Sequence, residues 1–200
     1  MLSDATMDKN MSTTLEKLER VYRDKSLCEI YDVFGDEENF NVGYVIGFDD
    51  EYAIFELFGL LGQYEGYACL WLELIEDIVP DTDYTNRIKR LTNLQGFTRN
   101  YPEINISTGC INSVVRYIVE EKKVCEMRLN DLDADDESAF GYITSLCGIE
   151  ATICPLDEDG REEDEFTFDI EELDLLLVCG PELECLALLH DNPEHLGESQ

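Results

Sequence analysis

Residues 42–58, VGYVIGFDDEYAIFELF, decide the fold because they recur at a shift of 98 as residues 140–156, FGYITSLCGIEATICPL. In this alignment Gly43 falls on Gly141, and the apolar positions coincide without a gap. Two unrelated β-rich segments would drift out of register, since strand residues alternate between two faces. Here the register holds over about fifty residues. The sequence therefore predicts two copies of one unit.

The match continues upstream, where residues 25–30 resemble residues 122–127 at a shift of 97, so one short length change separates the two stretches. Each copy opens with a predicted helix, which in the first copy is placed by the capping-box spacing of Thr13 and Glu16. Short segments rich in β-branched and aromatic residues follow and predict strands. In the first copy these strands are expected at residues 27–34, 41–48, 52–58, 67–72 and 74–79. Short helices at residues 83–94 and 181–190 are expected to close the two copies.

A helix followed by five short, bent strands is the outline of a small barrel of the Sm-like type. We therefore expect an α+β, β-rich fold of two tandem five-stranded antiparallel barrels, each with an N-terminal helix and a short C-terminal helix. The expected boundaries are unit 1 at 11–94, a linker at 95–107, unit 2 at 108–190, and flexible tails at 1–10 and 191–200.

The net charge restricts the partners. The chain has 46 Asp and Glu against 14 Lys and Arg, a formal charge of -32. Residues 1–100 carry 20 acids and 9 bases, whereas residues 101–200 carry 26 acids and 5 bases. Such a surface repels phosphates and anionic lipids. We expect a neutral or basic protein partner, no direct nucleic-acid binding and no membrane contact; the oligomeric state stays open.

The cysteine pattern indicates a reducing compartment. No two of the eight cysteines have C-x-x-C or zinc-knuckle spacing, and most lie in apolar runs. Free cysteine is usually buried, so we expect small buried thiols in a cytoplasmic protein. The first ten residues lack the pattern of a secretion signal, and no apolar run is long enough to cross a bilayer.

The motifs of common enzymes are absent from the sequence, so we expect no catalytic residue, no metal and no cofactor. We find no nucleophile elbow, no phosphate-binding loop and no dinucleotide fingerprint. The only histidines, His190 and His195, lie near the C-terminus and are interpreted as solvated. Asp131, Asp133 and Asp135 resemble the start of a calcium loop, but the glycine and the final glutamate of that motif are missing.

Four stretches of unit 1 resemble a family of uncharacterised proteins of Gram-positive bacteria. They are GYV at 43–45, DEYA at 50–53, GQYEGY at 62–67 and LELIEDI at 72–78. The resemblance covers roughly residues 25–94 and implies Sm-like small barrels in tandem, with no function to transfer.

The aromatic side chains of unit 1 offer one candidate partner-binding surface. Tyr64 and Tyr67 flank a predicted turn, where tyrosine is often exposed and suits protein contacts. At the matching positions of unit 2, Glu162 stands for Tyr64 and Asp164 for Gly66.

The second candidate surface is acidic. Residues 157–161, DEDGR, predict a hairpin turn in which Gly160 adopts positive φ. Together the two surfaces give the expected partner-binding residues: Tyr64, Tyr67, Asp157, Asp159, Glu162, Glu163 and Asp164.

Three functional classes fit these observations. The first is a non-catalytic interaction module, an adaptor or inhibitor that holds a protein partner. The second is a nucleic-acid mimic that blocks the basic cleft of a DNA- or RNA-binding enzyme, as phage and mobile-element proteins do. The third is an enzyme that uses carboxylates, for which no recognised catalytic set is present. Acidic surfaces often serve solubility alone, which favours the interaction module.

Overall fold

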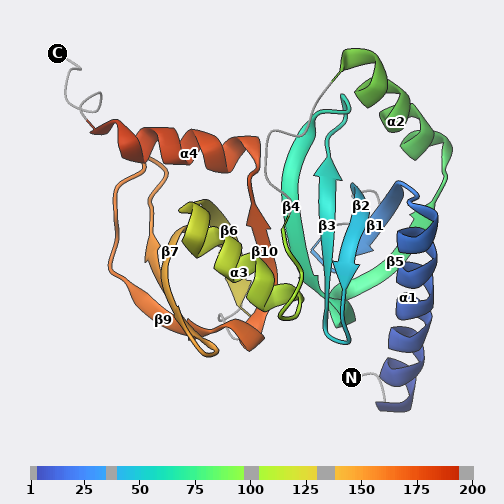
Figure 1. Cartoon of the computed structure of the whole chain (residues 1–200), viewed down its shortest axis with the longest axis horizontal. Helices are drawn as coiled ribbons and strands as arrows, with labels where there is room; N and C mark the ends of the chain where they lie inside the picture. The colour runs from blue at the N-terminus through green and yellow to red at the C-terminus, as the bar shows by residue number, and fades with distance from the viewer. Residues whose placement is uncertain (1–3, 35–39, 97–103, 130–137, 194–200) are drawn as a thin grey trace. The chain divides into compact units, whose positions relative to one another are not determined.

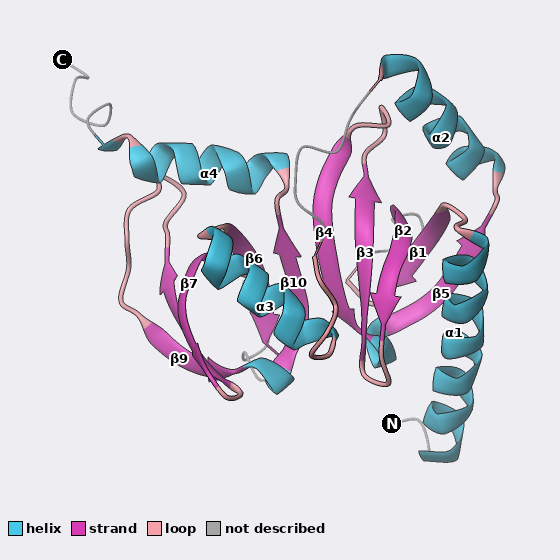
Figure 2. Cartoon of the chain, viewed as in Figure 1, coloured by secondary structure: helices cyan, strands magenta, loops and turns pink. Residues whose placement is uncertain are grey.

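The structure is a computed structural model that describes residues 4–34, 40–96, 104–129 and 138–193 (Figure 1). The chain divides into two compact units, Met1–Glu103 (unit 1) and Ile104–Gln200 (unit 2). Within the described ranges the two units together contain four α-helices and ten antiparallel strands (Figure 2). The protein therefore has an α+β fold that is rich in β-structure.

Unit 1 contains a long helix, five strands with a 3-10 turn, and a second helix. Its elements are α1 (Asp4–Asp24), β1 (Cys28–Asp32), β2 (Asn41–Phe48), β3 (Tyr52–Phe58), β4 (Tyr64–Trp71), η1 (Leu72–Leu74), β5 (Ile75–Pro80) and α2 (Asp83–Gln95). The strands pair in the antiparallel order β5-β1-β2-β3-β4. Helix α1 packs against β2 and β5.

Unit 2 has the same sequence of elements. They are α3 (Cys110–Glu121), β6 (Val124–Leu129), β7 (Ala139–Cys147), β8 (Glu150–Pro155), β9 (Phe166–Asp169), η2 (Ile170–Glu172), β10 (Leu173–Val178) and α4 (Pro181–Asp191). The strand order is β10-β6-β7-β8-β9, again antiparallel. Helix α3 packs on β7, and α4 contacts β6.

Strand register is repeated between the units. Each β2–β3 residue pair has a β7–β8 counterpart at a shift of 98; for example, Gly43–Leu57 becomes Gly141–Pro155. The bulge in β2 recurs at the same place in β7. The β1–β2 pairs also have counterparts in β6–β7. Residues of β1 and β6 are related by a shift of 97, and their partners in β2 and β7 by a shift of 98. The strand pairing of one unit therefore maps onto that of the other, residue by residue, at the shifts found in the sequence.

The tight turns recur as well. Lys25 and Lys122 both have a φ of 50°, and each directly follows the opening helix of its unit. Gly62 and Gly160, at the tips of the equivalent hairpins, have φ values of 77° and 78°. Gly160 therefore adopts the positive φ that the sequence predicts.

Each sheet is strongly curled. In unit 1, β4 and β5 lie at opposite ends of the strand order, although only the three residues of η1 separate them. Five flat strands would place these edges roughly 20 Å apart, whereas three residues span at most about 11 Å. The sheet must therefore bend until its two edge strands approach at this corner. The strand order is that of an open sheet, so the closed barrels that the sequence predicts are not seen in the strand pairing.

Helix α1 is longer than the sequence predicts. It begins at Asp4, so Thr13 lies inside the helix, and the predicted helix start at Thr13 is wrong. The reason is that no Gly or Pro interrupts residues 4–12, which allows the helix to continue through a segment expected to be a tail. Among the helices in the described ranges, none is long and apolar enough to cross a membrane.

Candidate functional site

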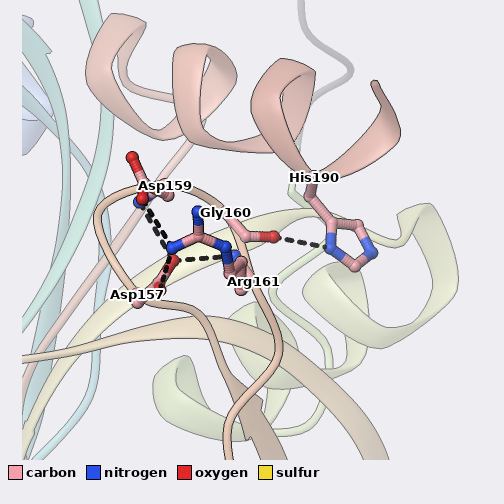
Figure 3. A network of polar contacts seen from close by, with 5 residues as sticks. All are labelled: Asp157, Asp159, Gly160, Arg161 and His190. Atoms are coloured by element: carbon pink, nitrogen blue, oxygen red, sulfur yellow. Dashed lines mark hydrogen bonds and ion pairs between the residues drawn. The ribbon is translucent and has the colours of Figure 1, made fainter. Parts of the chain in front are cut away.

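A tight turn between β8 and β9 is shaped by the carboxylate of Asp157 (Figure 3). Its Oδ1 accepts hydrogen bonds from the backbone N–H groups of Asp159, at 3.0 Å, and Arg161, at 2.8 Å. The guanidinium of Arg161 lies 2.6 Å from Oδ2 of Asp159 and 3.4 Å from Oδ2 of Asp157. The backbone N–H of Arg161, followed by that of Asp159, holds the pKa of Asp157 below its usual range. We call residues 157–161 the acidic turn.

The acidic turn packs against α4 at Gly160. Nδ1 of His190 donates a hydrogen bond to the carbonyl oxygen of Gly160 at 3.1 Å (Figure 3). A Cβ at Gly160 would lie 2.6 Å from the backbone nitrogen of His190, so a larger residue cannot approach α4 this closely. The ring of His190 also lies 5.2 Å from that of Tyr142. His190 is therefore part of a packed corner, and its predicted place in a solvated tail is wrong.

An apolar groove lies beside this corner, between α4, the start of β7 and the acidic turn. Its apolar lining consists of Phe140, Leu156, Pro181, Leu183, Cys185, Leu186 and Leu189. Leu156 and Leu183 are buried, whereas Phe140 and Leu189 are 36% and 44% exposed. The volume of about 480 Å³ falls within the range of about 300–1,000 Å³ that is usual for binding pockets. We call this feature the α4 groove.

In unit 1 the corresponding space is filled by aromatic rings. The rings of Phe40 and Tyr84 meet edge to face with centroids 5.2 Å apart, and those of Tyr44 and Phe58 do so at 5.7 Å. These rings pack on the buried core residues Leu27, Val42 and Ile88. Unit 1 therefore closes this part of its core with its own side chains.

Three aromatic residues of unit 1 are replaced in unit 2, and two of the replacements, Leu156 and Glu182, line the groove. At a shift of 98, Ser138 replaces Phe40, Leu156 replaces Phe58 and Glu182 replaces Tyr84. In unit 2 the core residues here are Val124, Leu156 and Leu183, which have Tyr142, Leu177, Leu186 and Ala187 packed around them. No ring stands at these three positions of unit 2, whereas Phe140, which itself lines the groove, stands where unit 1 has Val42. Unit 2 is left with a concave apolar surface.

Carboxylates surround this apolar surface. Asp157, Glu158 and Glu182 line the α4 groove, and no lysine or arginine does so. An apolar floor with a negative rim favours a ligand that combines apolar groups with positive charge. In the described part of the chain, His, Cys, Asp and Glu side chains do not gather into a group of three or more that could hold a metal ion.

No family model, curated protein or solved structure matches the chain. The function is therefore inferred from the geometry of the two units and from the differences between them.

The two predicted tyrosines do not form an exposed loop. Tyr67 lies within β4 and is only 1% exposed, so the expectation that it is a surface contact is wrong. Tyr64 is half-buried at the start of β4, with its ring 5.7 Å from that of Tyr67. The turn instead occupies residues 59–62, where the N–H of Gly62 donates to the carbonyl of Gly59 at 2.8 Å. Leu60 and Leu61 form its tip between two glycines, Gly59 and Gly62.

The predicted acids lie together on one hairpin but in two environments. Asp157 and Asp159 are half-buried within the acidic turn, where both contact Arg161. Glu162, Glu163 and Asp164 follow as an exposed run. Of these five acids, Asp157 alone lines the α4 groove. The predicted calcium loop at Asp131 to Asp135 and the residue His195 lie outside the described residues.

Sequence reasoning missed the α4 groove itself. Its leucines are predicted to be ordinary core residues, because the hydrophobic periodicity of a segment is the same whether its apolar side chains line a groove or pack in a core. A usable signal was present in the comparison of the two copies. The exchanges of Phe58 for Leu156 and of Tyr84 for Glu182 remove aromatic volume from a position that the register shows to be equivalent.

Proposed function

We propose that this protein is a non-catalytic interaction module whose unit 2 holds a segment of a protein partner in the α4 groove. The observation that carries the proposal is the difference between the two units. Unit 1 fills this space with Phe40, Phe58 and Tyr84, whereas unit 2 leaves it open and lines it with Leu156 and Leu183. The strand order is the same in both units, so the proposal attributes the groove of unit 2 to its side chains.

The charge around the groove defines the chemistry of the partner. A segment that inserts large aliphatic side chains and carries lysine or arginine beside them fits the apolar floor and the carboxylates of Glu158 and Glu182. Both of these carboxylates are exposed, so their pairing with a partner requires little desolvation. The apolar contact supplies most of the affinity, and the carboxylates select for positive charge.

On this proposal each unit is a small barrel of the Sm-like type, as the resemblance to the uncharacterised Gram-positive family implies. The strand order β5-β1-β2-β3-β4 after a leading helix, and the curl at η1, support this assignment. The proposal also places the protein in a reducing compartment such as the cytoplasm, since its eight cysteines are free and six of them are buried.

A peptide titration tests the function. The probe is a fluorescein-labelled helical peptide with leucines on one face and lysines on the other, and fluorescence anisotropy reports its binding to the full chain. The filled-groove variant, Leu156→Phe with Glu182→Tyr, introduces two of the rings of unit 1. We expect it to weaken binding at least tenfold, which corresponds to about 1.4 kcal/mol.

Two controls separate the groove from general electrostatics. Glu182→Gln removes the same charge without filling the groove, and it should retain most of the affinity. A peptide in which serine replaces leucine should bind weakly to every variant. Equal binding of the leucine peptide by the wild type and the filled-groove variant would contradict the proposed site.

A nucleic-acid mimic is the second candidate, and the exposed acids at residues 162–165 favour it. A mimic must lose its partners when this run is neutralised, because its affinity depends on charge. The test is a pulldown from a bacterial lysate at low and high salt with the variant Glu162→Gln, Glu163→Gln, Asp164→Asn and Glu165→Gln. Asp157 is left intact because it shapes the acidic turn. If basic nucleic-acid enzymes are not enriched at low salt, the mimic hypothesis fails.

A further inference from the structure

Unit 1 carries a second unusual surface at the position equivalent to the α4 groove. Leu60 and Leu61, at the tip of its β3–β4 hairpin, are 68% and 64% exposed. Leu94, near the end of α2, is 73% exposed. We call these three residues the leucine patch. A cluster of large exposed aliphatic side chains marks an interaction surface.

The hairpin and α2 hold the leucine patch together. Nε2 of Gln95 donates a hydrogen bond to the carbonyl oxygen of Leu61 at 2.7 Å, and Oγ1 of Thr92 donates to that of Gly62 at 2.8 Å. Figure 1 shows this hairpin tip beside the last turn of α2. The patch is therefore built on two elements that are fastened to each other.

Helix α2, on one side of the leucine patch, carries an excess of bases, whereas Glu65 lies beside the hairpin turn on the other. Helix α2 carries Arg87, Lys89 and Arg90 against one acid, Asp83, so its net charge is positive in a chain of net charge -32. All three bases are exposed. Arg87, Arg90 and Leu94 follow at spacings of three and four residues, which places them on one stripe of the helix.

The two units have diverged to opposite character at equivalent positions. At a shift of 98, Leu60 and Leu61 correspond to Glu158 and Asp159 of the acidic turn. Helix α4 contains Glu182, Glu184 and Asp191 and no lysine or arginine. Unit 1 thus presents apolar side chains next to the basic helix α2, and unit 2 presents an apolar hollow among acids. Each surface has the chemistry that the other would recognise.

We propose that the leucine patch of one molecule docks into the α4 groove of a second copy of this chain. The inference rests on the proposed function of the groove and names the partner. Leu60 and Leu61 enter the apolar hollow, while Arg87 and Arg90 face the carboxylates of Glu158 and Glu182. Because patch and groove are different surfaces, the contact is head to tail, and each bound pair retains one free patch and one free groove.

The overall charge determines the conditions under which this contact forms. Two chains of net charge -32 repel each other at long range, and about 0.15 M salt shortens that repulsion to roughly 8 Å. The local attraction acts at contact distance and is screened less. Association is therefore measured near physiological ionic strength.

Sedimentation velocity of the full chain over a wide concentration range tests the proposal. The patch variant is Leu60→Ser with Leu61→Ser, and the groove variant is Leu156→Phe with Glu182→Tyr. We expect the wild type to show a weight-average mass that rises with concentration, and each variant alone to stay monomeric. A one-to-one mixture of the variants should form dimers and nothing larger, because it contains one intact patch and one intact groove.

Controls make each outcome decisive. Ile149→Ser removes an exposed apolar side chain elsewhere in unit 2 and should associate like the wild type. Circular dichroism checks that each variant is folded, and Phe140→Ser with Leu189→Ser serves as a second groove variant. The proposal is overturned by a monomeric wild type, by a patch or groove variant that associates like the wild type, or by a mixture of these two variants that stays monomeric. If the wild type is monomeric but still binds the leucine–lysine peptide, the self-association fails while the proposed function stands.

Discussion

Tyr67 is a core residue of unit 1, buried in β4 beside the ring of Tyr64. Its replacement by alanine should lower the free energy of unfolding by about 3–5 kcal/mol, the usual cost of deleting a buried aromatic ring. Urea denaturation measures the loss. Leu94→Ala, at a site 73% exposed, is the matched control and should change the stability by no more than about 0.5 kcal/mol. A loss of stability at Tyr67 as small as that of the control would contradict the assignment of Tyr67 to the core.

Single residues also decide whether the equivalent space is core or groove. Phe58 and Tyr84 in unit 1 and Leu156 and Glu182 in unit 2 occupy equivalent positions on equivalent elements. A ring is retained in one unit, and a smaller or charged side chain stands in the other. The backbone register is unchanged by these exchanges, so the surface at this position can change without altering the fold.

At the scale of elements, the contact between the acidic turn and α4 depends on Gly160. A Cβ there would meet α4 backbone at 2.6 Å, whereas Gly148, also at positive φ, has no atom within 4 Å. Gly148→Ala should cost only the left-handed strain of about 1–2 kcal/mol. Gly160→Ala should cost this strain plus roughly 1–3 kcal/mol for overpacking. Urea midpoints of the two variants check the order, and equal losses would show that the turn does not press on α4.

The strands and the duplication could be predicted because they depend on local alternation and on the internal repeat. The shifts of 98 and 97 gave the register of both sheets, including the relation of Cys28 to Cys125. The start of β4 was predicted at Tyr67 instead of Tyr64, because the turn was expected between these tyrosines, whereas it lies at residues 59–62, between two glycines.

The candidate site was predictable only in part. The acidic turn follows from the run DEDGR and the glycine within it, which are local signals. The α4 groove is a space between α4 and β7 that side chains do not fill. The hydrophobic periodicity of a single segment does not show whether such a space is filled. Only the comparison of Phe58 with Leu156 and of Tyr84 with Glu182 points to it.

At the scale of the whole molecule, the net charge of -32 opposes the compact state. The melting temperature should therefore rise by several degrees as NaCl increases from about 10 to 150 mM, because the Debye length falls from roughly 30 to 8 Å. Differential scanning calorimetry measures this shift. An equal ionic strength of KCl should give the same rise, which separates screening from specific ion binding. A melting temperature that stays constant or falls would contradict the predicted self-repulsion.

The chain contains its own probe of the central claim that the α4 groove is the binding surface. Cys185 lines the groove, whereas Cys147 is an exposed cysteine at the end of β7. The other six cysteines are buried, and burial raises the pKa of Cys28 and of Cys125 to about 12. Iodoacetamide at about pH 8 should therefore modify Cys147 and Cys185 of the folded chain and leave the buried thiols intact.

The most direct measurement is the alkylation rate of Cys185 relative to Cys147, read by peptide mass spectrometry with and without the leucine–lysine peptide at saturation. Occupation of the α4 groove should slow modification of Cys185 at least tenfold and leave the rate at Cys147 unchanged. Unchanged rates at both cysteines while anisotropy reports a bound peptide, or an equal slowing at both, would contradict the account.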